Sequence, residues 1–253
     1  MTDEDRQAGE VVLGAISPFV VGLVARDDDG RQGRMIGTGT ALRFRTSNMV
    51  LIADHVLRNS VPEDIFFIPP PANGFRLSTS GTDSPEYNWR FQAAFRGVRD
   101  ESLDVAALVF DNEIPGCRFF DLPETASTPG KNTPVAICGY PRAKAKPFLW
   151  GDVVGFIACP DFQGATLMDP DAVGDLRSFQ FAIDYPDNTG VPPSGYSGAM
   201  VWYDRAGCRT LEELRERLDI GAAGIVTDHR TAHAALACTK IESIIHFLQQ
   251  NLE

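Results

Sequence analysis

Three short segments of the chain carry a histidine, an aspartate and a serine in settings that suit covalent catalysis. His55 and Asp104 each adjoin an apolar stretch, and Ser197 lies in a glycine-containing turn. A hydroxyl nucleophile needs an imidazole to accept its proton and a carboxylate to hold that imidazole in one tautomer. The three residues occur in the order histidine, aspartate, serine. This order is informative, because unrelated folds build the same triad in other orders. Asp100 and Glu101 are alternative carboxylates, but Asp104 is favoured because it directly precedes the apolar run.

The residues around Ser197 predict a turn that exposes its hydroxyl. Gly195 and Gly198 flank the serine, and glycine adopts backbone dihedrals that other residues rarely visit. Such a turn would direct the backbone N–H groups of Gly195 and Ser197 at the negative oxygen that develops during acyl transfer. Ser194 is an alternative nucleophile, but it lacks the preceding glycine.

Short apolar or alternating runs separated by turn residues predict many strands and few helices. The predicted strands fall at residues 11–25, 37–44, 49–52, 65–68, 90–95, 105–110, 134–141, 151–157, 178–183, 199–203 and 223–227, with a hairpin turn at 27–30. Helices are predicted at 210–218, where Thr210 and Glu213 form a capping-box pattern, and at 240–252, where one face is apolar. This pattern predicts an all-β protein of closed or sandwiched antiparallel sheets with a C-terminal helix.

Composition limits the classes of partner and cofactor. A formal net charge of −11 argues against a nucleic-acid binder, and no run of residues is long and apolar enough for a membrane span. The chain has no HExxH pattern and no Cys/His cluster, so neither a metal nor another cofactor is predicted. Five scattered cysteines and an acidic start without a signal-peptide pattern predict a cytoplasmic protein with reduced thiols.

These motifs together resemble the trypsin/chymotrypsin superfamily of serine proteases. The resemblance rests on the triad segments, on residues 37–40 before the histidine, on residues 139–141, and on residues 223–226. It implies two antiparallel six-stranded β-barrels with the active site between them. The first barrel, with His55 and Asp104, would span residues 8–122, and the second, with Ser197 and the C-terminal helix, residues 130–253. The implied activity is that of a serine endopeptidase acting on a protein or peptide substrate.

The resemblance also implies where a substrate side chain would bind. It places Val191 at the base of the pocket and Thr227 and Asp228 at its wall. Valine supplies no carboxylate for a lysine or arginine, so a small or apolar side chain is expected, whereas Asp228 favours a basic one. A further hypothesis is that the enzyme is controlled either by a partner or by a poorly ordered active-site loop, residues 186–196. The segment between Trp202 and Ile225 is the candidate surface for a partner.

Departures from the family pattern leave an alternative open. Relatives often carry a small residue at the position of Asp54, an aspartate at that of Tyr196 and a glycine at that of Ala199. These differences keep a catalytically inactive protease fold, used for binding or scaffolding, as the alternative. Ala199 also breaks the Gly-x-Ser-x-Gly motif of an α/β-hydrolase esterase, which makes that class a poor fit.

Overall fold

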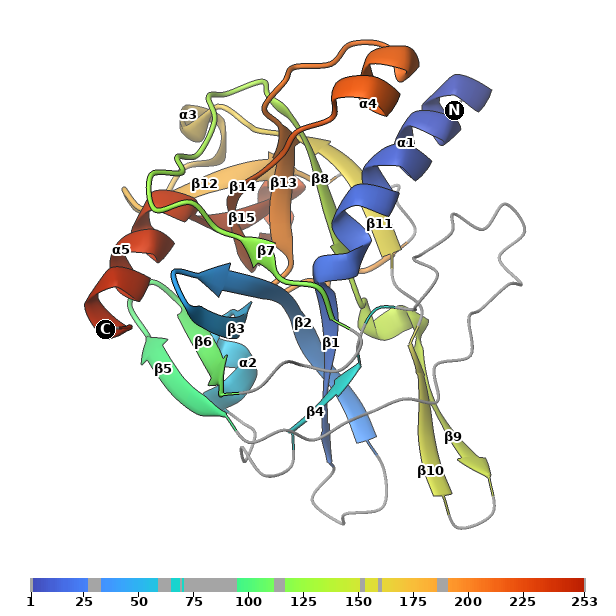
Figure 1. The fold of residues 1–253 in the computed structure, drawn as a ribbon, viewed down its shortest axis with the longest axis vertical. Helices are drawn as coiled ribbons and strands as arrows, with labels where there is room; N and C mark the ends of the chain where they lie inside the picture. Colours follow the sequence, from blue (N-terminus) through green and yellow to red (C-terminus); the bar gives the residue numbers. More distant parts are fainter. Residues whose placement is uncertain are drawn as a thin grey trace.

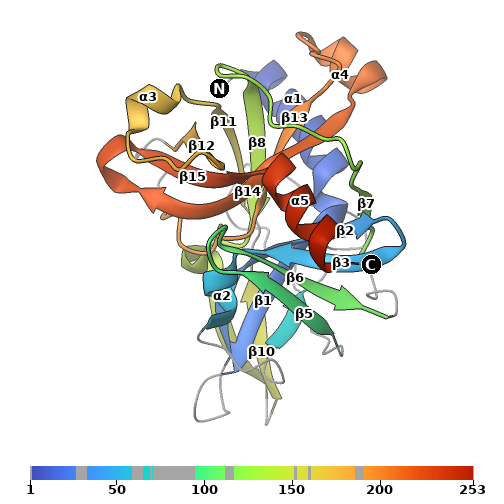
Figure 2. The same ribbon diagram turned by 90° about the vertical axis from the view of Figure 1, so that its left-hand side faces the viewer.

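Two antiparallel sheets, one above the other in Figure 2, form most of the molecule. This is a computed structural model that describes residues 2–26, 33–58, 65–68, 70, 95–111, 117–150, 153–158, 161–185 and 191–252. The predicted turn at 27–30 and most of the predicted strand at 90–95 lie outside these residues. The predicted domain limits at residues 122 and 130 stay a prediction.

The first sheet brings the ends of two buried strands together. Its strands run in the order β4 (Ile65–Ile68), β1 (Val20–Arg26), β2 (Gly33–Phe44), β3 (Ser47–Ile52), β6 (Val105–Phe110) and β5 (Arg96–Asp100), and the short β7 (Phe120–Asp121) pairs with β2 in parallel. All residues of β6 are buried, which explains its unbroken apolar sequence. Ile52 pairs with Ala106, so the residues that follow β3 lie beside those that precede β6.

The second sheet holds the turn that contains Ser197. Its strands run in the order β11 (Asp161–Thr166), β8 (Pro134–Gly139), β13 (Met200–Asp204), β14 (Ile220–Arg230), β15 (Ala235–Lys240) and β12 (Gln180–Asp184). A separate hairpin consists of β9 (Ala145–Trp150) and β10 (Val153–Ala158). Met200 pairs with Ile225, so the turn leading into β13 lies against β14.

Of the predicted pair of closed six-stranded barrels, the structure shows two antiparallel sheets, and a bridge joins the edges of one of them. A bridge between Leu167, just after β11, and Ile183 in β12 joins the two edges of the second sheet. In the first sheet, the described residues show no pairing that joins β4 to β5. The molecule is therefore mostly β, with two antiparallel sheets and a C-terminal helix.

The two predicted helices are confirmed. Helix α4 (Leu211–Arg217) begins with the capping box of Thr210 and Glu213. Helix α5 (Ile241–Asn251) buries its apolar face, and Figure 1 shows it where the two sheets meet. The described residues also form two shorter helices, α2 (Asp54–Arg58) and α3 (Pro170–Val173), and 3-10 turns at Ser17–Phe19, Arg142–Lys144 and Thr231–His233.

A helix at the N-terminus corrects the prediction of a strand over 11–25. Helix α1 (Asp3–Ile16) begins with a second capping box, in which the Thr2 hydroxyl accepts the Asp5 N–H and the Asp5 carboxylate accepts the Thr2 N–H. Acidic residues in the first turn also favour a helix, because they face its positive end. Pro18 in the following 3-10 turn ends this helix, and the strand begins only at Val20.

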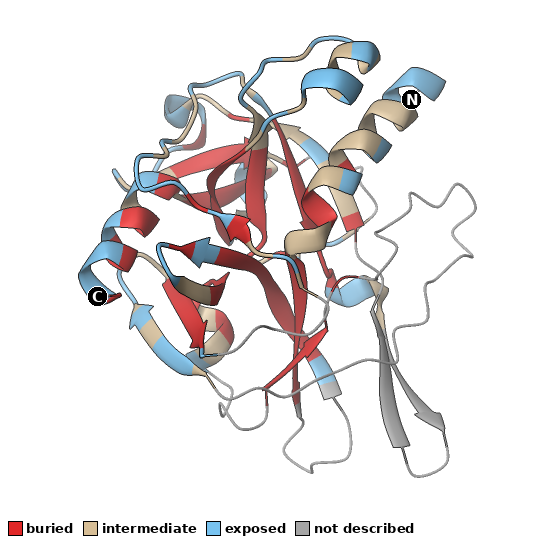
Figure 3. Cartoon of the chain, in the orientation of Figure 1, coloured by how far each residue is buried: buried red, intermediate tan, exposed pale blue. Residues whose placement is uncertain are grey.

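One apolar core joins the two sheets. Its buried residues come from α1, from β1, β2, β3, β4, β6 and β7 of the first sheet, from β8, β13 and β14 of the second, and from α5. Figure 3 shows these strands as buried and the outer turns of α1, α4 and α5 as more exposed. None of the helices in the described part of the chain combines the length and apolar character needed to cross a bilayer.

Candidate active site

A short helix carries His55 at the end of β3. The preceding residue, Asp54, is fully buried and accepts hydrogen bonds from Arg58 Nε at 2.8 Å and Arg99 Nε at 2.6 Å. Burial alone would raise the pKa of Asp54, but the hydrogen bonds and charges of Arg99 and Arg58 outweigh it and lower the pKa. The ionised Asp54 thus fastens α2 to β5, which fixes the place of His55.

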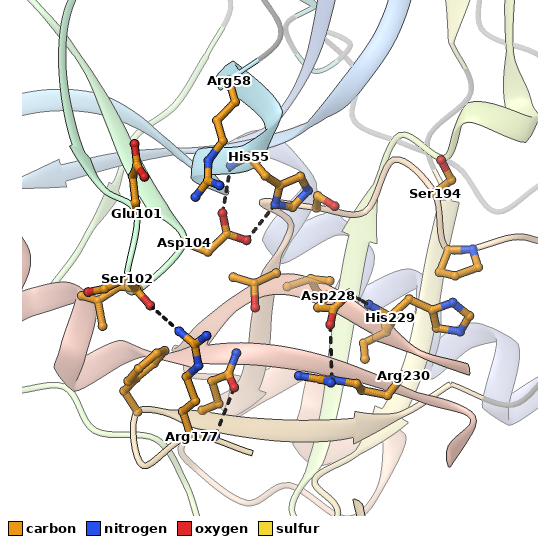
Figure 4. A pocket seen from close by; sticks show the side chains of 18 of the residues that line it. His55, Arg58, Glu101, Ser102, Asp104, Arg177, Ser194, Asp228, His229 and Arg230 are labelled. Carbon is orange, nitrogen blue, oxygen red and sulfur yellow. Dashed lines mark hydrogen bonds and ion pairs between the residues drawn. The ribbon is translucent and has the colours of Figure 1, made fainter. Parts of the chain in front are cut away.

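Asp104 holds His55 through both its backbone and its ring. Its Oδ1 accepts the His55 backbone N–H at 2.8 Å, and its Oδ2 lies 2.7 Å from His55 Nδ1 (Figure 4). An imidazole that donates from Nδ1 leaves Nε2 as the basic nitrogen. Asp104 has a left-handed backbone with φ of 54°, which aspartate tolerates better than most residues. Asp100 instead accepts hydrogen bonds from Ser102 and Leu103.

The turn before β13 requires glycine on both sides of Ser197. Gly195 and Gly198 have φ values of 106° and 89°, in the region that side chains rarely adopt. A Cβ on Gly195 would overlap the Tyr140 carbonyl, and one on Gly198 would overlap the Thr38 carbonyl. These glycines therefore let the turn pack closely against both sheets.

The same turn leaves two backbone donors available. The amides of Tyr196, Gly198 and Ala199 donate to carbonyl groups at 3.1, 2.8 and 2.7 Å. In the part of the chain that the structure describes, the N–H groups of Gly195 and Ser197 meet no hydrogen-bond acceptor. These are the two amides that the sequence predicts for an oxyanion.

Thr38 links the two sheets at this turn. Its hydroxyl donates to the Gly195 carbonyl at 2.7 Å and accepts the Tyr140 N–H at 2.8 Å. Its own N–H donates to the Ser197 carbonyl at 3.0 Å. The sequence predicts a strand at residues 37–44 and a family resemblance at 37–40, but no local signal reveals contacts to residues so far along the chain.

One cavity of about 690 Å³ brings the three predicted catalytic residues together. His55, Asp104 and Ser197 all line it, and so do Thr227 and Asp228 of the predicted substrate pocket. Figure 4 shows His55 and Asp104 on one side of it and Asp228, His229 and Arg230 on the other. Ser194, the alternative nucleophile, also lines this cavity.

The predicted substrate-binding residues differ in their surroundings. Thr227 is buried and its hydroxyl donates to the Ala237 carbonyl at 3.2 Å. Asp228 lies 3.2 Å from Arg230 Nε, which offsets its charge and weakens the argument for a basic substrate side chain. Val191 does not line the cavity within the described residues, and its carbonyl accepts the Tyr185 hydroxyl at 2.6 Å. Residues 186–190 of the predicted active-site loop lie outside the described residues.

Metal ligands are not gathered here. Among the described residues, no three side chains of His, Cys, Asp or Glu are grouped so that they could hold an ion. The described cysteines 117, 138, 208 and 238 are free thiols, and burial raises the pKa of Cys117 to about 12. Such a thiol stays protonated and is a poor nucleophile at neutral pH.

Comparison with known proteins identifies the fold. No family model matches the chain, and no curated protein matches it. Among solved structures, it is similar to the crystal structure of a scabies mite inactivated protease paralogue, S-I1, with a TM-score of 0.60 over 98% of each chain. The chain therefore has the chymotrypsin-like fold of trypsin-like proteases. With 16% sequence identity, this similarity shows the fold alone.

Proposed function

We propose that the chain is a serine endopeptidase that works through an acyl-enzyme. The observation that carries the proposal is the pairing of His55 with Asp104 in a cavity that Ser197 also lines. The N–H groups of Gly195 and Ser197, which meet no acceptor among the described residues, support it further, because an oxyanion needs such donors. No cofactor is required for this chemistry.

The reaction would proceed in two steps, acylation of Ser197 and hydrolysis of the acyl-enzyme. His55 Nε2 takes the proton of the Ser197 hydroxyl while Oγ forms a bond to the substrate carbonyl carbon. The amides of Gly195 and Ser197 donate to the resulting oxyanion. The tetrahedral intermediate collapses, the C–N bond breaks, and the imidazolium of His55 gives its proton to the leaving amine. A water molecule then attacks the ester carbonyl while His55 takes its proton. The second tetrahedral intermediate collapses, His55 returns the proton to Ser197 Oγ, and the carboxylic acid product leaves.

Covalent labelling tests this proposal. The purified protein is treated with a fluorophosphonate probe, and the labelled peptide is identified by mass spectrometry. Label is expected on Ser197 rather than Ser194, and its rate should fall at least about 10³-fold in His55→Ala. The matched control is Ser178→Ala, because Ser178 does not line the cavity. Label on Ser194, or a rate unaffected by His55→Ala, would contradict the assignment.

A binding or scaffolding module is the second candidate function. The similar mite structure is described as an inactivated protease paralogue, so this fold also exists without activity. The presence of His55, Asp104 and Ser197 favours the enzyme for this chain. Absence of any label on a folded protein would leave two possibilities, this module or an enzyme that awaits its activator.

We also propose a setting for the enzyme. A cytoplasmic endopeptidase acting on protein or peptide substrates would need restraint, and the segment between Trp202 and Ile225 is the proposed surface for a regulatory protein. Helix α4 in this segment already contacts α1, where Arg215 donates to Gln7 at 2.8 Å. Full turnover of a generic protein substrate by the purified monomer would argue against partner control.

A further inference from the structure

A polar cluster centred on the buried Asp161 includes Tyr196 of the turn that contains Ser197. Tyr196 is fully buried, and its hydroxyl donates to the Asp161 carboxylate. Lys144 forms an ion pair with the other oxygen of Asp161, and Gln163 donates to that carboxylate at 2.6 Å. We call these four residues the tyrosine–aspartate cluster.

The hydroxyl of Tyr196 is held as a permanent donor. Burial raises the pKa of Tyr196 well above its usual value, and the negative charge of Asp161 raises it further. The phenol therefore keeps its proton across the range in which proteins work. The buried carboxylate of Asp161 is thus compensated by a hydroxyl donor from inside the molecule and by a partly exposed lysine.

The ring of Tyr196 also has little freedom. It packs edge to face against Tyr185, with ring centroids 5.9 Å apart. A Cβ on Gly139 would come within 2.8 Å of the ring, so glycine at that position leaves the space that the ring fills. Both ends of the side chain are therefore fixed, the ring by packing and the hydroxyl by Asp161.

We propose that Tyr196 is a positioning residue that holds the oxyanion-binding turn through Asp161. This inference rests on the proposed function. Tyr196 lies between Gly195 and Ser197, so anchoring its side chain limits rotation of the peptide units that carry both unpaired amides. Asp161 and Gln163 belong to β11 and Lys144 to the 3-10 turn after β8, so the anchor is internal to this half of the molecule.

Hydrogen exchange tests the anchor without relying on catalysis. NMR on the full chain would compare wild type with Tyr196→Phe, which keeps the ring and removes only the hydroxyl. The amides of Gly198 and Ala199 should exchange at least about tenfold faster, the effect of losing one hydrogen bond to a charged group. Tyr203→Phe is the matched control, because Tyr203 lies on β13 outside the cluster, and it should leave these amides unchanged. Equal exchange in all three proteins would overturn the proposal.

Kinetics separate positioning from general stability. With an ester substrate, Tyr196→Phe should lower kcat about 10- to 100-fold and leave KM within about twofold, because the oxyanion forms only in the transition state. Asp161→Asn should likewise lower kcat and leave KM nearly unchanged. It also serves as the test if Tyr196→Phe folds poorly. An unchanged kcat, or a change confined to KM, would contradict the proposal. If wild type proves inert toward the fluorophosphonate, the kinetic comparison has no signal, while the exchange measurement still decides whether the cluster holds the turn.

Discussion

Replacing Thr38 with valine tests whether the link between the two sheets holds the Ser197 turn. Valine has nearly the shape of threonine but cannot hydrogen bond. The change removes the donor to the Gly195 carbonyl and the acceptor for the Tyr140 N–H, both at a fully buried position. Each buried group left unpaired costs about 1–3 kcal/mol, and the added methyl recovers part of this. The free energy of unfolding should therefore fall by about 2–4 kcal/mol.

Thr40 provides a matched control on the same strand. It lies two residues further along β2, on the same face, and is 1% exposed. Unlike that of Thr38, its hydroxyl has no hydrogen-bond partner among the described residues. Thr40→Val should therefore leave stability unchanged or raise it by about 1 kcal/mol, because no bond is lost and an unpaired hydroxyl is removed.

Urea unfolding followed by circular dichroism would measure both variants. A loss of 2–4 kcal/mol corresponds to a fall in Tm of about 4–16 °C for a chain of this size. Equal free energies of unfolding for Thr38→Val and Thr40→Val would refute the reasoning, since the two changes differ only in the hydrogen bonds they remove.

Three further substitutions test the site. Gly198→Ala should lower the free energy of unfolding by at least about 3 kcal/mol in urea, because its Cβ would overlap the Thr38 carbonyl; near-normal stability would contradict this. Asp104→Asn should keep the fold, since asparagine tolerates a positive φ, yet slow fluorophosphonate labelling about 10⁴-fold through loss of the correct His55 tautomer. The pKa of Asp54 is lower in the folded protein than its unfolded value near 3.8. The stability that ionised Asp54 contributes is therefore fully present above the unfolded pKa and is lost as the pH falls through the lower folded pKa. Asp54→Asn should thus cost about 1–3 kcal/mol at pH 7 and flatten the acid side of a stability-against-pH curve, and an unchanged curve would oppose this role.

Local signals in the sequence predict much of the architecture. The capping box at Thr210 predicts α4, and the apolar periodicity after residue 240 predicts α5; both are confirmed. The N-terminal helix was missed because the apolar residues 11–16 were joined to the strand that follows. The second capping box, at Thr2 and Asp5, is a signal that would have found it.

Contacts between distant residues are what the sequence does not reveal. The bond from Thr38 to Gly195 joins residues 157 apart, and that from Tyr196 to Asp161 joins residues 35 apart. Hydrophobic periodicity reports which face of an element is buried, but it does not report which polar groups meet there. Asp54 and Tyr196 were therefore counted as departures from a family pattern, although each has charged or polar partners that only the fold brings to it.

The core shared by α1, the two sheets and α5 affects the order of events during synthesis. Helix α5 follows every other described element in the chain, and its buried residues belong to the same core as β1 and β3. Strand β3, which precedes His55, and strand β6, which follows Asp104, therefore leave the ribosome long before the residues that complete their packing. A chain still being made contains His55 and Asp104 before the residues of the second sheet that line the same cavity have been made. On the proposed function, Ser197 would therefore have no completed site until α5 has been made.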